Sequence, residues 1–291
     1  MLIKRKEEMK NHTSFKIGGI VDIFAEPENI EELIELIKFL RDNDFIYYIC
    51  GNGTNLLVAD KGIRGVVVHI GQNISNIKLQ KSNKTKIEVE PGATMAQISD
   101  FCIKNGLKGF EPLSGIPGTI GGAIAMNASA YQKEIKDLVD KVDVLEEDGK
   151  INQYKKDELE FDYRKSIIDG QNKIVTRVIL SLENGDPKEI EENVNKYREL
   201  RNKKQPVEHS SAGSTFKRPK GDYASRLIDE CGLKGAKVGD AVVSDKHAGF
   251  IINTGNAKAS DVLKLMDKIK ESVNIYYGVM LEPEYRIWGK F

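Results

Sequence analysis

Residues Ile30–Asp42 carry a clear alternation of apolar and polar positions. The apolar residues recur there at intervals of three and four, at Ile30, Leu33, Ile34, Ile37 and Leu40. This spacing places them on one face of an amphipathic helix. The polar pair Glu28-Asn29 stands directly before it and caps its start.

Further helices and a set of short strands are predicted along the rest of the chain. The helices are expected at Met95–Asn105, Pro187–Lys204, Tyr223–Cys231 and Ser260–Tyr276. The strands are expected at Ile23–Ala25, Phe45–Cys50, Gly65–Ile70, Lys86–Glu90, Ala241–Val243 and Gly249–Asn253, with more strands within Lys141–Leu182. Helix Pro187–Lys204 is highly charged and reads as a surface connection, so we expect a domain boundary near it.

Composition and charge narrow the class of protein. The chain has 291 residues, enough for two or three subdomains, and 44 Lys and Arg balance 44 Asp and Glu. This balance predicts no nucleic-acid partner. The charged N-terminus, the three cysteines without a CxxC pair and the lack of an apolar run of ~20 residues predict a soluble cytoplasmic protein without a membrane partner.

A first glycine-rich loop follows the predicted strand Phe45–Cys50 and reads Gly51-Asn52-Gly53-Thr54-Asn55-Leu56. In this layout backbone amides and the Thr54 and Asn55 side chains can hold a diphosphate without a lysine. The loop is neither a Walker A loop nor a complete GxGxxG fingerprint, and Asn-Gly is also an ordinary hairpin turn. Alone, it is weak evidence for a nucleotide site.

A second glycine-rich stretch, Glu111–Tyr131, contains two prolines, small apolar residues and almost no charge. Glycine adopts positive φ readily and lets an anion approach the backbone closely. The glycines in question are Gly115, Gly118, Gly121 and Gly122. A short helix is expected at Ile120–Asn127, whose first-turn amides and dipole favour a phosphate. A tight turn into a buried helix would contain the same residues.

An arginine and a serine-rich turn are candidates for contacting a substrate. Arg164 lies among aromatic residues in Phe161–Ser166, where it packs over a ring, pairs with an acid such as Asp162, or faces a substrate carboxylate. Ser210–Pro219 combines several hydroxyls with two cations, although serine-rich turns are usually only loops.

The last candidate is the terminal stretch Leu281–Trp288, where strand alternation places Glu284 and Arg286 on one face. A surface ion pair is the more common meaning of such a pair. The four histidines show no metal-ligand spacing and HExxH is absent, so no metal is expected. The absence of a GxSxG elbow argues against a serine hydrolase.

Seven stretches, in this order, resemble the UDP-N-acetylenolpyruvoylglucosamine reductases of peptidoglycan synthesis. They are NHTSFKIGG, GNGTNLL, EPLSGIPGTIGGAIAMNASAY, FDYRKSI, AGSTFKRP, LIDECGLKGAKVGDAVVSDKHAGFIIN and LEPEYRIWG. The resemblance covers nearly the whole chain, and seven ordered motifs are far more specific than one glycine loop.

The resemblance implies an α+β protein with an FAD-binding domain of the vanillyl-alcohol-oxidase and p-cresol-methylhydroxylase type. This domain would comprise two subdomains, at residues 1–75 and 76–195. A smaller α+β substrate-binding domain would follow at residues 196–291, with the last strand returning toward the flavin. No histidine stands out as a covalent tether, so we expect noncovalent FAD.

The same resemblance assigns FAD to the two glycine-rich stretches. The residues expected to contact the cofactor are Gly51, Asn52, Gly53, Thr54, Asn55, Leu56, Ser114, Gly115, Ile116, Pro117, Gly118, Thr119, Gly121, Gly122 and Asn127.

The chemistry implied by the resemblance is reduction of the enolpyruvyl ether of UDP-N-acetylglucosamine to UDP-N-acetylmuramate, with NADPH as hydride donor to FAD. Arg164 and Glu284 match the pair that stabilises the enol-like intermediate. An arginine acts by its charge, whereas a glutamate must be protonated, with a raised pKa, or must orient another donor. Ser214 matches the residue that donates a proton to the carbon bearing the carboxylate.

Lys204, Arg218 and Lys234 match positions around the nucleotide diphosphate, and Arg286 matches a position near the substrate. At this length the chain lacks room for the insertion whose tyrosine closes over the nucleotide in the longer branch of the family. It therefore resembles the shorter branch, and the cover over UDP is left open. A monomer is expected.

Two alternatives stay open. One is a sugar or alcohol oxidase on the same flavin fold, against which the stretches AGSTFKRP and LEPEYR argue. The other is a nonenzymatic nucleotide-binding module.

Overall fold

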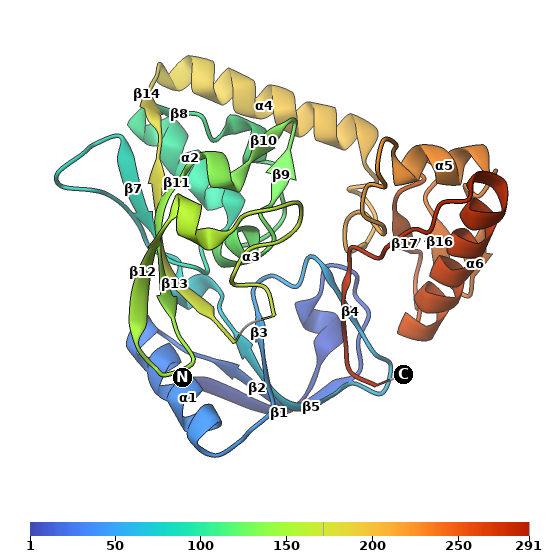
Figure 1. Cartoon of the computed structure of the whole chain (residues 1–291), viewed down its shortest axis with the longest axis horizontal. Helices are drawn as coiled ribbons and strands as arrows, with labels where there is room; N and C mark the ends of the chain where they lie inside the picture. Colours follow the sequence, from blue (N-terminus) through green and yellow to red (C-terminus); the bar gives the residue numbers. More distant parts are fainter. Residues whose placement is uncertain (171, 291) are drawn as a thin grey trace. The chain divides into compact units, whose positions relative to one another are not determined.

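The computed structural model describes residues 1–170 and 172–290, which form two compact units. Unit 1 contains Met1–Ile3, Ala25–Gly51 and Val67–Leu200, and unit 2 contains Lys4–Phe24, Asn52–Val66 and the residues from Arg201 onward. The colours of Figure 1 follow the chain through its elements. Each unit is therefore assembled from three separate segments of the sequence.

The chain crosses from one unit to the other within regular elements as well as loops. These elements are β1 (Leu2–Glu8), β2 (Ile20–Glu26), β5 (Ile63–His69) and α4 (Pro187–Lys204). Strands β1, β2 and β5 belong to a four-stranded sheet in the order β1-β2-β5-β3. The last crossing lies within α4, the helix near which the sequence predicts a boundary; the finer division at residues 75 and 195 stays a prediction.

A five-stranded antiparallel sheet organises unit 1, in the order β12-β11-β13-β7-β6. Its strands are β6 (Ile77–Leu79), β7 (Lys86–Val89), β11 (Val139–Leu145), β12 (Ile151–Lys155) and β13 (Ile174–Ser181). Side chains alternate between its two faces: Val142 and Val178 are fully buried, whereas the neighbouring Asp143 and Arg177 pair on the polar face.

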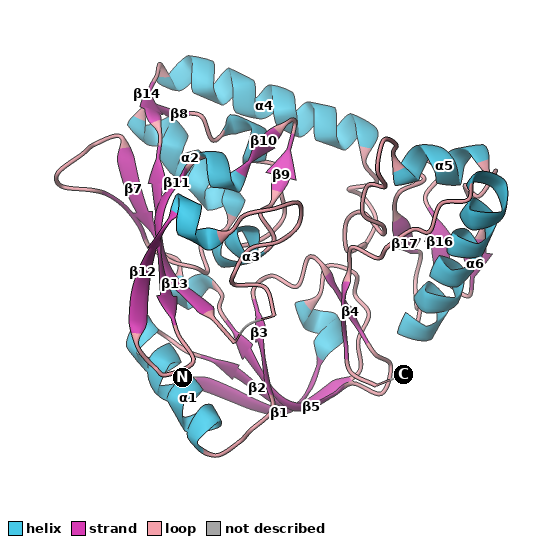
Figure 2. Ribbon diagram, viewed as in Figure 1, coloured by secondary structure: helices cyan, strands magenta, loops and turns pink. Residues whose placement is uncertain are grey.

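Two helices complete the core of unit 1 against this sheet. Helices α2 (Met95–Asn105) and α3 (Ile120–Ala125) contribute buried residues such as Ile98 and Ile124 to the same cluster as Val142 and Val178. Figure 2 shows these cyan helices beside the magenta strands. The remaining elements of unit 1 are α1 (Ile30–Asp42), β3 (Tyr47–Cys50), β8 (Leu107–Lys108), β9 (Ser129–Ala130), β10 (Lys133–Glu134) and β14 (Glu183–Asn184).

The sequence predicts the long helices well because their signals are local. The bounds of α1, α2 and α4 are confirmed as Ile30–Asp42, Met95–Asn105 and Pro187–Lys204. Asn29 caps α1, since its side chain accepts a hydrogen bond of 2.8 Å from the Glu32 amide. Helix α3 was expected to reach Asn127 but ends at Ala125.

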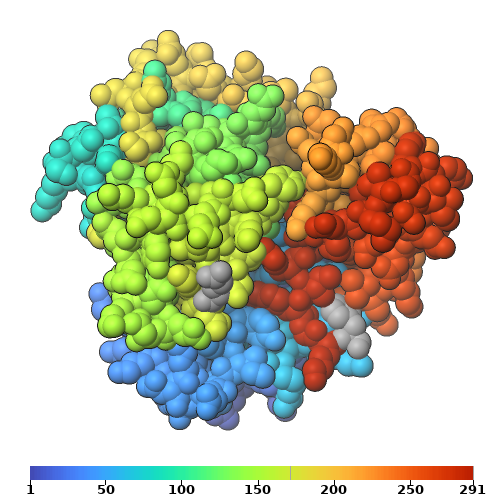
Figure 3. Space-filling view, viewed as in Figure 1, coloured from blue at the N-terminus to red at the C-terminus, as the bar shows by residue number. Residues whose placement is uncertain are grey.

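Unit 2 contains a three-stranded antiparallel sheet, β15-β16-β17, and two helices. Its elements are β4 (Leu56–Val58), α5 (Ala224–Glu230), β15 (Lys237–Val238), β16 (Ala241–Val243), β17 (Ile251–Asn253), α6 (Ala259–Tyr277) and β18 (Arg286–Trp288). The last strand, β18, pairs in parallel with β4. In Figure 3 the orange and red atoms belong to the part of unit 2 that follows α4.

Within the described residues, no helix is long and apolar enough to cross a membrane. The same residues contain no group of three or more His, Cys, Asp or Glu side chains that could hold a metal ion.

The cap of α6 is supplied by a distant residue, which gives a test of unit 2. The Asp60 carboxylate accepts hydrogen bonds of 2.7 Å from the Ala259 amide and 3.1 Å from the Ser260 amide. We expect Asp60→Ala to lower the free energy of unfolding by about 1–2 kcal/mol, because two amides of the first turn lose their acceptor. Urea unfolding followed by circular dichroism measures this change.

The matched control is Asp267→Ala, which removes only an exposed pair with Lys270 on the same helix. It should change the free energy by less than about 0.5 kcal/mol. Equal effects of the two substitutions would contradict the capping role of Asp60.

Candidate active site

The first glycine-rich loop offers three backbone amides in succession. Gly53 has a φ of +59°, and a Cβ there would lie 2.1 Å from the His12 carbonyl oxygen, so only glycine fits. Its own carbonyl accepts a hydrogen bond of 3.2 Å from the Ser14 amide. Within the described residues, the amides of Asn52, Gly53 and Thr54 donate to no protein acceptor. Such a run of amides can bind an anion.

The start of this loop lies against the second glycine-rich stretch, within unit 1. A Cβ on Gly51 would lie 2.4 Å from Oγ1 of Thr119. Thr119 is the N-cap of α3, and its Oγ1 accepts from the Gly122 amide at 3.4 Å. The two stretches, which are far apart in the sequence, therefore meet at Gly51 and Thr119.

Two first-turn amides of α3, which were expected to favour a phosphate, already have acceptors in the protein. The Ile120 amide donates to the Ala93 carbonyl at 2.8 Å, and the Gly121 amide donates to the Pro91 carbonyl at 2.9 Å. These two groups are already bonded, so they are not left for an anion. In the preceding turn, Ser114–Thr119, the amides without an acceptor among the described residues are those of Gly115, Gly118 and Thr119.

Arg164 occupies a tight turn in unit 1. Asp162 and Lys165 close the turn with two backbone hydrogen bonds of 3.0 and 3.2 Å, and Arg164 has a φ of +57°. Its Nη1 donates to Ser129 Oγ at 2.8 Å, and its Cζ lies 5.2 Å from the centre of the Tyr163 ring. A left-handed backbone at a nonglycine residue costs of order 1 kcal/mol and is often found at functional sites.

The end of α3 holds this turn in place through side chains. Asn127 is 1% exposed, and its Nδ2 donates to the Asp162 carbonyl at 3.0 Å and to Glu134 at 2.9 Å. Ser166 Oγ donates to the Ala125 carbonyl at 3.0 Å. The Asn127 side chain thus helps to position the Arg164 turn, and its expected contact with the cofactor stays a prediction.

Ser214 and Glu284 are brought together in unit 2. The Glu284 amide donates to the carbonyl of Thr215, the residue after Ser214, at 2.9 Å, and the Lys217 amide donates to the Glu282 carbonyl at 2.9 Å. Asn55 joins the same group, because its Nδ2 donates to the Glu284 carbonyl at 3.1 Å. The first glycine-rich loop, the serine-rich turn and the terminal stretch thus meet within one unit.

The cations expected near a diphosphate lie on the surface of unit 2, and two of them have partners there. Lys234 forms an ion pair of 2.6 Å with Asp229, and the Arg218 Cζ lies 4.3 Å from the centre of the Tyr223 ring. Lys204 is exposed at the last turn of α4. Arg286 begins β18, and its amide donates to the Asn55 carbonyl at 2.9 Å.

Two buried groups near Ser214 have shifted pKa values. Burial raises the pKa of the Tyr285 phenol, so this side chain stays protonated at neutral pH. Burial lowers the pKa of His247, and nearby Lys234 lowers it further. The Gly249 amide donates to His247 Nδ1 at 3.1 Å, so the neutral ring carries its proton on Nε2.

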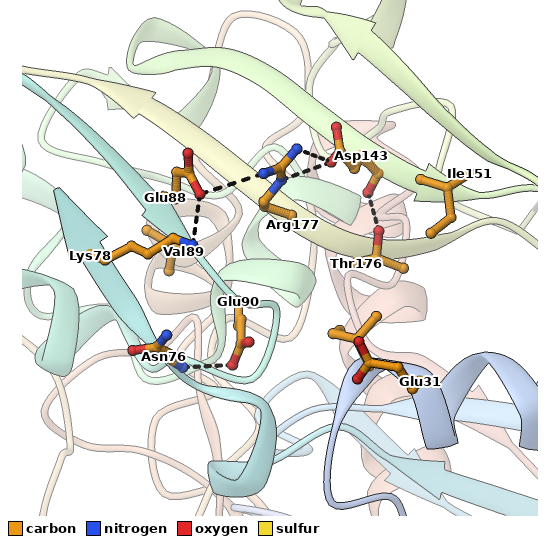
Figure 4. A pocket seen from close by; sticks show the side chains of 11 residues that line it. Glu31, Asn76, Lys78, Glu88, Val89, Glu90, Asp143, Ile151, Thr176 and Arg177 are labelled. Atoms are coloured by element: carbon orange, nitrogen blue, oxygen red, sulfur yellow. Dashed lines mark hydrogen bonds and ion pairs between the residues drawn. The ribbon is translucent and has the colours of Figure 1, made fainter. Parts of the chain in front are cut away.

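A separate groove in unit 1 contains none of the expected site residues. It has a volume of about 240 Å³ and lies over the polar face of the five-stranded sheet. Figure 4 shows Arg177 at its wall, between Asp143 at 2.7 Å and Glu88 at 3.4 Å. Both of its cations are already paired, Lys78 with Glu88 and Arg177 with Glu88 and Asp143, which makes it a salt-bridged surface rather than the candidate site.

The sequence did not indicate three side chains that contact the candidate catalytic residues or the backbone beside them. Ser129 receives the hydrogen bond of Arg164, and the Thr215 and Tyr285 hydroxyls lie 2.9 Å apart. Ser129 lies within a stretch already noted for its glycines. Thr215 directly follows Ser214, and Tyr285 directly follows Glu284. These neighbours could have been noticed in the sequence only after Ser214 and Glu284 were themselves suspected.

Two family models match the chain. The model described as the C-terminal domain of UDP-N-acetylenolpyruvoylglucosamine reductase matches residues 205–288, and one described as an FAD binding domain matches residues 21–154. The second range contains both glycine-rich stretches.

Relatives match over nearly the whole length. The UDP-N-acetylenolpyruvoylglucosamine reductase of Caldanaerobacter subterraneus subsp. tengcongensis is 49% identical over 98% of this chain and 93% of its own. That of Clostridium tetani is 46% identical over 99% of this chain and 92% of its own. The crystal structure of the Thermus caldophilus UDP-N-acetylenolpyruvylglucosamine reductase is similar, with a TM-score of 0.84, 35% identity and coverage of 99% and 100%.

Because Gly51 lies against Thr119, we expect flavin binding to require glycine at position 51. In Gly51→Ala the new methyl group would meet Thr119 Oγ1 at 2.4 Å, so the Thr119 side chain must rotate or shift from its capping position. Displacing Thr119 disturbs the cap of α3 and the amides beside it. We expect the Kd for FAD to rise about tenfold or more, measured by quenching of flavin fluorescence.

Gly185→Ala is the matched control in unit 1, because its Cβ would make a similarly tight contact, 3.0 Å from Lys108 Cβ, outside both glycine-rich stretches. It should bind FAD like the unchanged protein. Tight FAD binding by Gly51→Ala would show that the contact between the two stretches does not shape the cofactor site.

Proposed function

The chain belongs to the UDP-N-acetylenolpyruvoylglucosamine reductase family, and we propose that Arg164, Ser214 and Glu284 carry its reaction. The reaction is the NADPH-dependent reduction of the enolpyruvyl ether of UDP-N-acetylglucosamine to UDP-N-acetylmuramate, a step in peptidoglycan precursor synthesis. The observation that carries the assignment is the backbone hydrogen bond of 2.9 Å between Glu284 and the residue that follows Ser214.

The two glycine-rich stretches fit a noncovalent FAD. The unbonded amides of Asn52, Gly53 and Thr54 suit a diphosphate, as do those of Gly115 and Gly118. Gly51 and Gly53 have no space for a side chain, which keeps the backbone accessible. When bound and reduced, the flavin supplies the hydride that is added to the methylene carbon of the substrate.

Arg164 and Glu284 are proposed to stabilise the negative charge that moves into the substrate carboxylate. The guanidinium does so by its permanent charge and its paired N–H donors. Its bond to Ser129 Oγ fixes its direction. Glu284 acts either as a protonated donor or by orienting one.

Ser214 is proposed to give its hydroxyl proton to the carbon that bears the carboxylate. A serine hydroxyl is a weak acid, so it donates only to a strongly basic, carbanion-like centre. Within the described residues, Ser214 Oγ has no hydrogen-bond partner in the protein, and Ser214 is only partly buried. A hydroxyl without a partner of its own suits a direct contact with substrate.

The remaining assignments follow the same proposal. Lys204, Arg218 and Lys234 face the nucleotide diphosphate, and Arg286 lies near the substrate. Lys234 must then exchange its exposed pair with Asp229 for the diphosphate. We also propose a cytoplasmic monomer that binds no nucleic acid, with FAD-binding subdomains at residues 1–75 and 76–195 and a substrate-binding domain at residues 196–291.

Removal of the proton donor should separate the two halves of the reaction. In Ser214→Ala we expect NADPH to reduce the flavin within about twofold of the normal rate, because this step needs no proton from Ser214. Reoxidation by the enolpyruvyl substrate should slow by about a thousandfold or more, the upper part of the range for a lost general acid. Stopped-flow absorbance at the flavin bands measures both rates.

Ser211→Ala, in the same turn, is the control, because the Ser211 carbonyl and not its hydroxyl receives the bond from Ser14. It should leave both rates unchanged. A parallel fall of both rates in Ser214→Ala would make Ser214 a structural residue. Reoxidation of the unchanged enzyme by oxygen but not by the enolpyruvyl substrate would favour the oxidase alternative.

A further inference from the structure

Behind Ser214 and Glu284, unit 2 contains a buried pair of hydroxyl groups. Thr215 is 1% exposed and Tyr285 is 5% exposed, and their oxygens lie 2.9 Å apart. Thr215 Oγ1 also accepts from the Ile251 amide at 3.1 Å. The Tyr285 hydroxyl donates to the Gly213 carbonyl at 3.3 Å.

Only one assignment of donors and acceptors gives every hydroxyl proton in this series an acceptor. Each hydroxyl carries a single proton. Because Tyr285 gives its proton to the Gly213 carbonyl, Thr215 gives its own proton to Tyr285. Thr215 is then left to accept from the Ile251 amide. The result is a one-way series of hydrogen bonds from the backbone of β17 to the peptide that precedes Ser214.

The series holds Ser214 from both sides. The Gly213 carbonyl belongs to the peptide that joins Gly213 to Ser214, and the Thr215 amide donates to the Gly249 carbonyl at 2.8 Å. Glu284 is tied to the same point, because its amide donates to the Thr215 carbonyl and Tyr285 is its next residue. A change at Tyr285 would therefore move both groups.

No side chain fixes the conformation of Gly213. Gly213 has a φ of +80°, and a Cβ placed there would meet no described atom within 4 Å. Glycine restricts its own backbone less than any other residue. The hydrogen bond from the Tyr285 hydroxyl therefore helps to fix the carbonyl of this peptide, and the Phe15 ring, 5.7 Å away edge to face, restricts the Tyr285 ring.

We propose that Thr215 and Tyr285 are positioning residues, which fix Ser214 and Glu284 relative to each other for proton delivery to the substrate. The proposal rests on the catalytic roles given above to Ser214 and Glu284. Neither hydroxyl touches the substrate. Their effect is confined to the second half of the reaction, in which Ser214 gives up its proton.

Tyr285→Phe tests this role with little change in volume. We expect flavin reduction by NADPH to stay within about twofold of normal, while reoxidation by the enolpyruvyl substrate slows about tenfold to a hundredfold because Ser214 is misplaced. The solvent deuterium isotope effect on reoxidation should also rise, since proton transfer becomes more strongly rate-limiting. Stopped-flow absorbance in H2O and D2O provides these rates.

A pair of substitutions at Thr215 separates the hydroxyl from the shape of the side chain. Thr215→Val keeps the shape and removes the series, so it should slow reoxidation like Tyr285→Phe. Thr215→Ser restores the hydroxyl and should recover most of the rate. The double variant Thr215→Val/Tyr285→Phe should be no slower than the slower single variant, because both interrupt one series.

Tyr154→Phe is the control for the loss of a tyrosine hydroxyl, since that group donates to Glu146 at 2.7 Å within unit 1, whereas Ser214 belongs to unit 2. It should leave both half-reactions unchanged. Normal reoxidation in Tyr285→Phe, an equal fall in both half-reactions, or failure of Thr215→Ser to recover the rate would each overturn the positioning role. Failure of the unchanged enzyme to be reoxidised by the enolpyruvyl substrate would instead refute the proposed function.

Discussion

The pairing of Thr215–Lys217, directly after Ser214, with Glu282–Glu284 is the constraint on which the candidate active site depends. Two hydrogen bonds make this pairing, from the Glu284 amide to the Thr215 carbonyl and from the Lys217 amide to the Glu282 carbonyl. Both use only backbone groups, so the pairing itself engages neither the Ser214 nor the Glu284 side chain. Asn55 extends the pairing to the first glycine-rich loop. One backbone arrangement therefore places Ser214, Glu284 and Asn55 of the first glycine-rich loop in the same unit.

Gly51 and Gly53 of the first glycine-rich loop exclude a side chain for different reasons. At Gly53 the backbone is left-handed, and the His12 carbonyl fills the place of a side chain. At Gly51 the limit is purely steric, because Thr119 occupies that place. The amides without a protein acceptor therefore lie in the two loops. The first turn of α3 is different, because its amides already donate to the Pro91 and Ala93 carbonyls. A six-residue helix with bonded first-turn amides has little to offer a diphosphate.

How far the sequence predicts the structure depends on how local each signal is. The bounds of α1, α2 and α4 could be predicted because periodicity and capping act within a few residues. The partners of the α3 amides could not, since Pro91 and Ala93 approach only after folding. The motif match could suggest Arg164, Ser214 and Glu284, and the structure adds that the last two are neighbours. The Thr215–Tyr285 pair spans 70 residues and has no local pattern, so only the folded chain reveals it.

The groups proposed for binding and those proposed for catalysis are held by different kinds of interaction. Lys234 and Arg218 lie at the surface, in an ion pair and over an aromatic ring, and such exposed contacts contribute little free energy. A diphosphate can therefore replace the Asp229 partner of Lys234 at small cost. Ser214 is held by buried, uncharged hydrogen bonds, which are costly to break in a low-dielectric interior. The side chains proposed to bind the nucleotide can thus rearrange at small cost, whereas moving Ser214, the proposed proton donor, requires breaking buried hydrogen bonds.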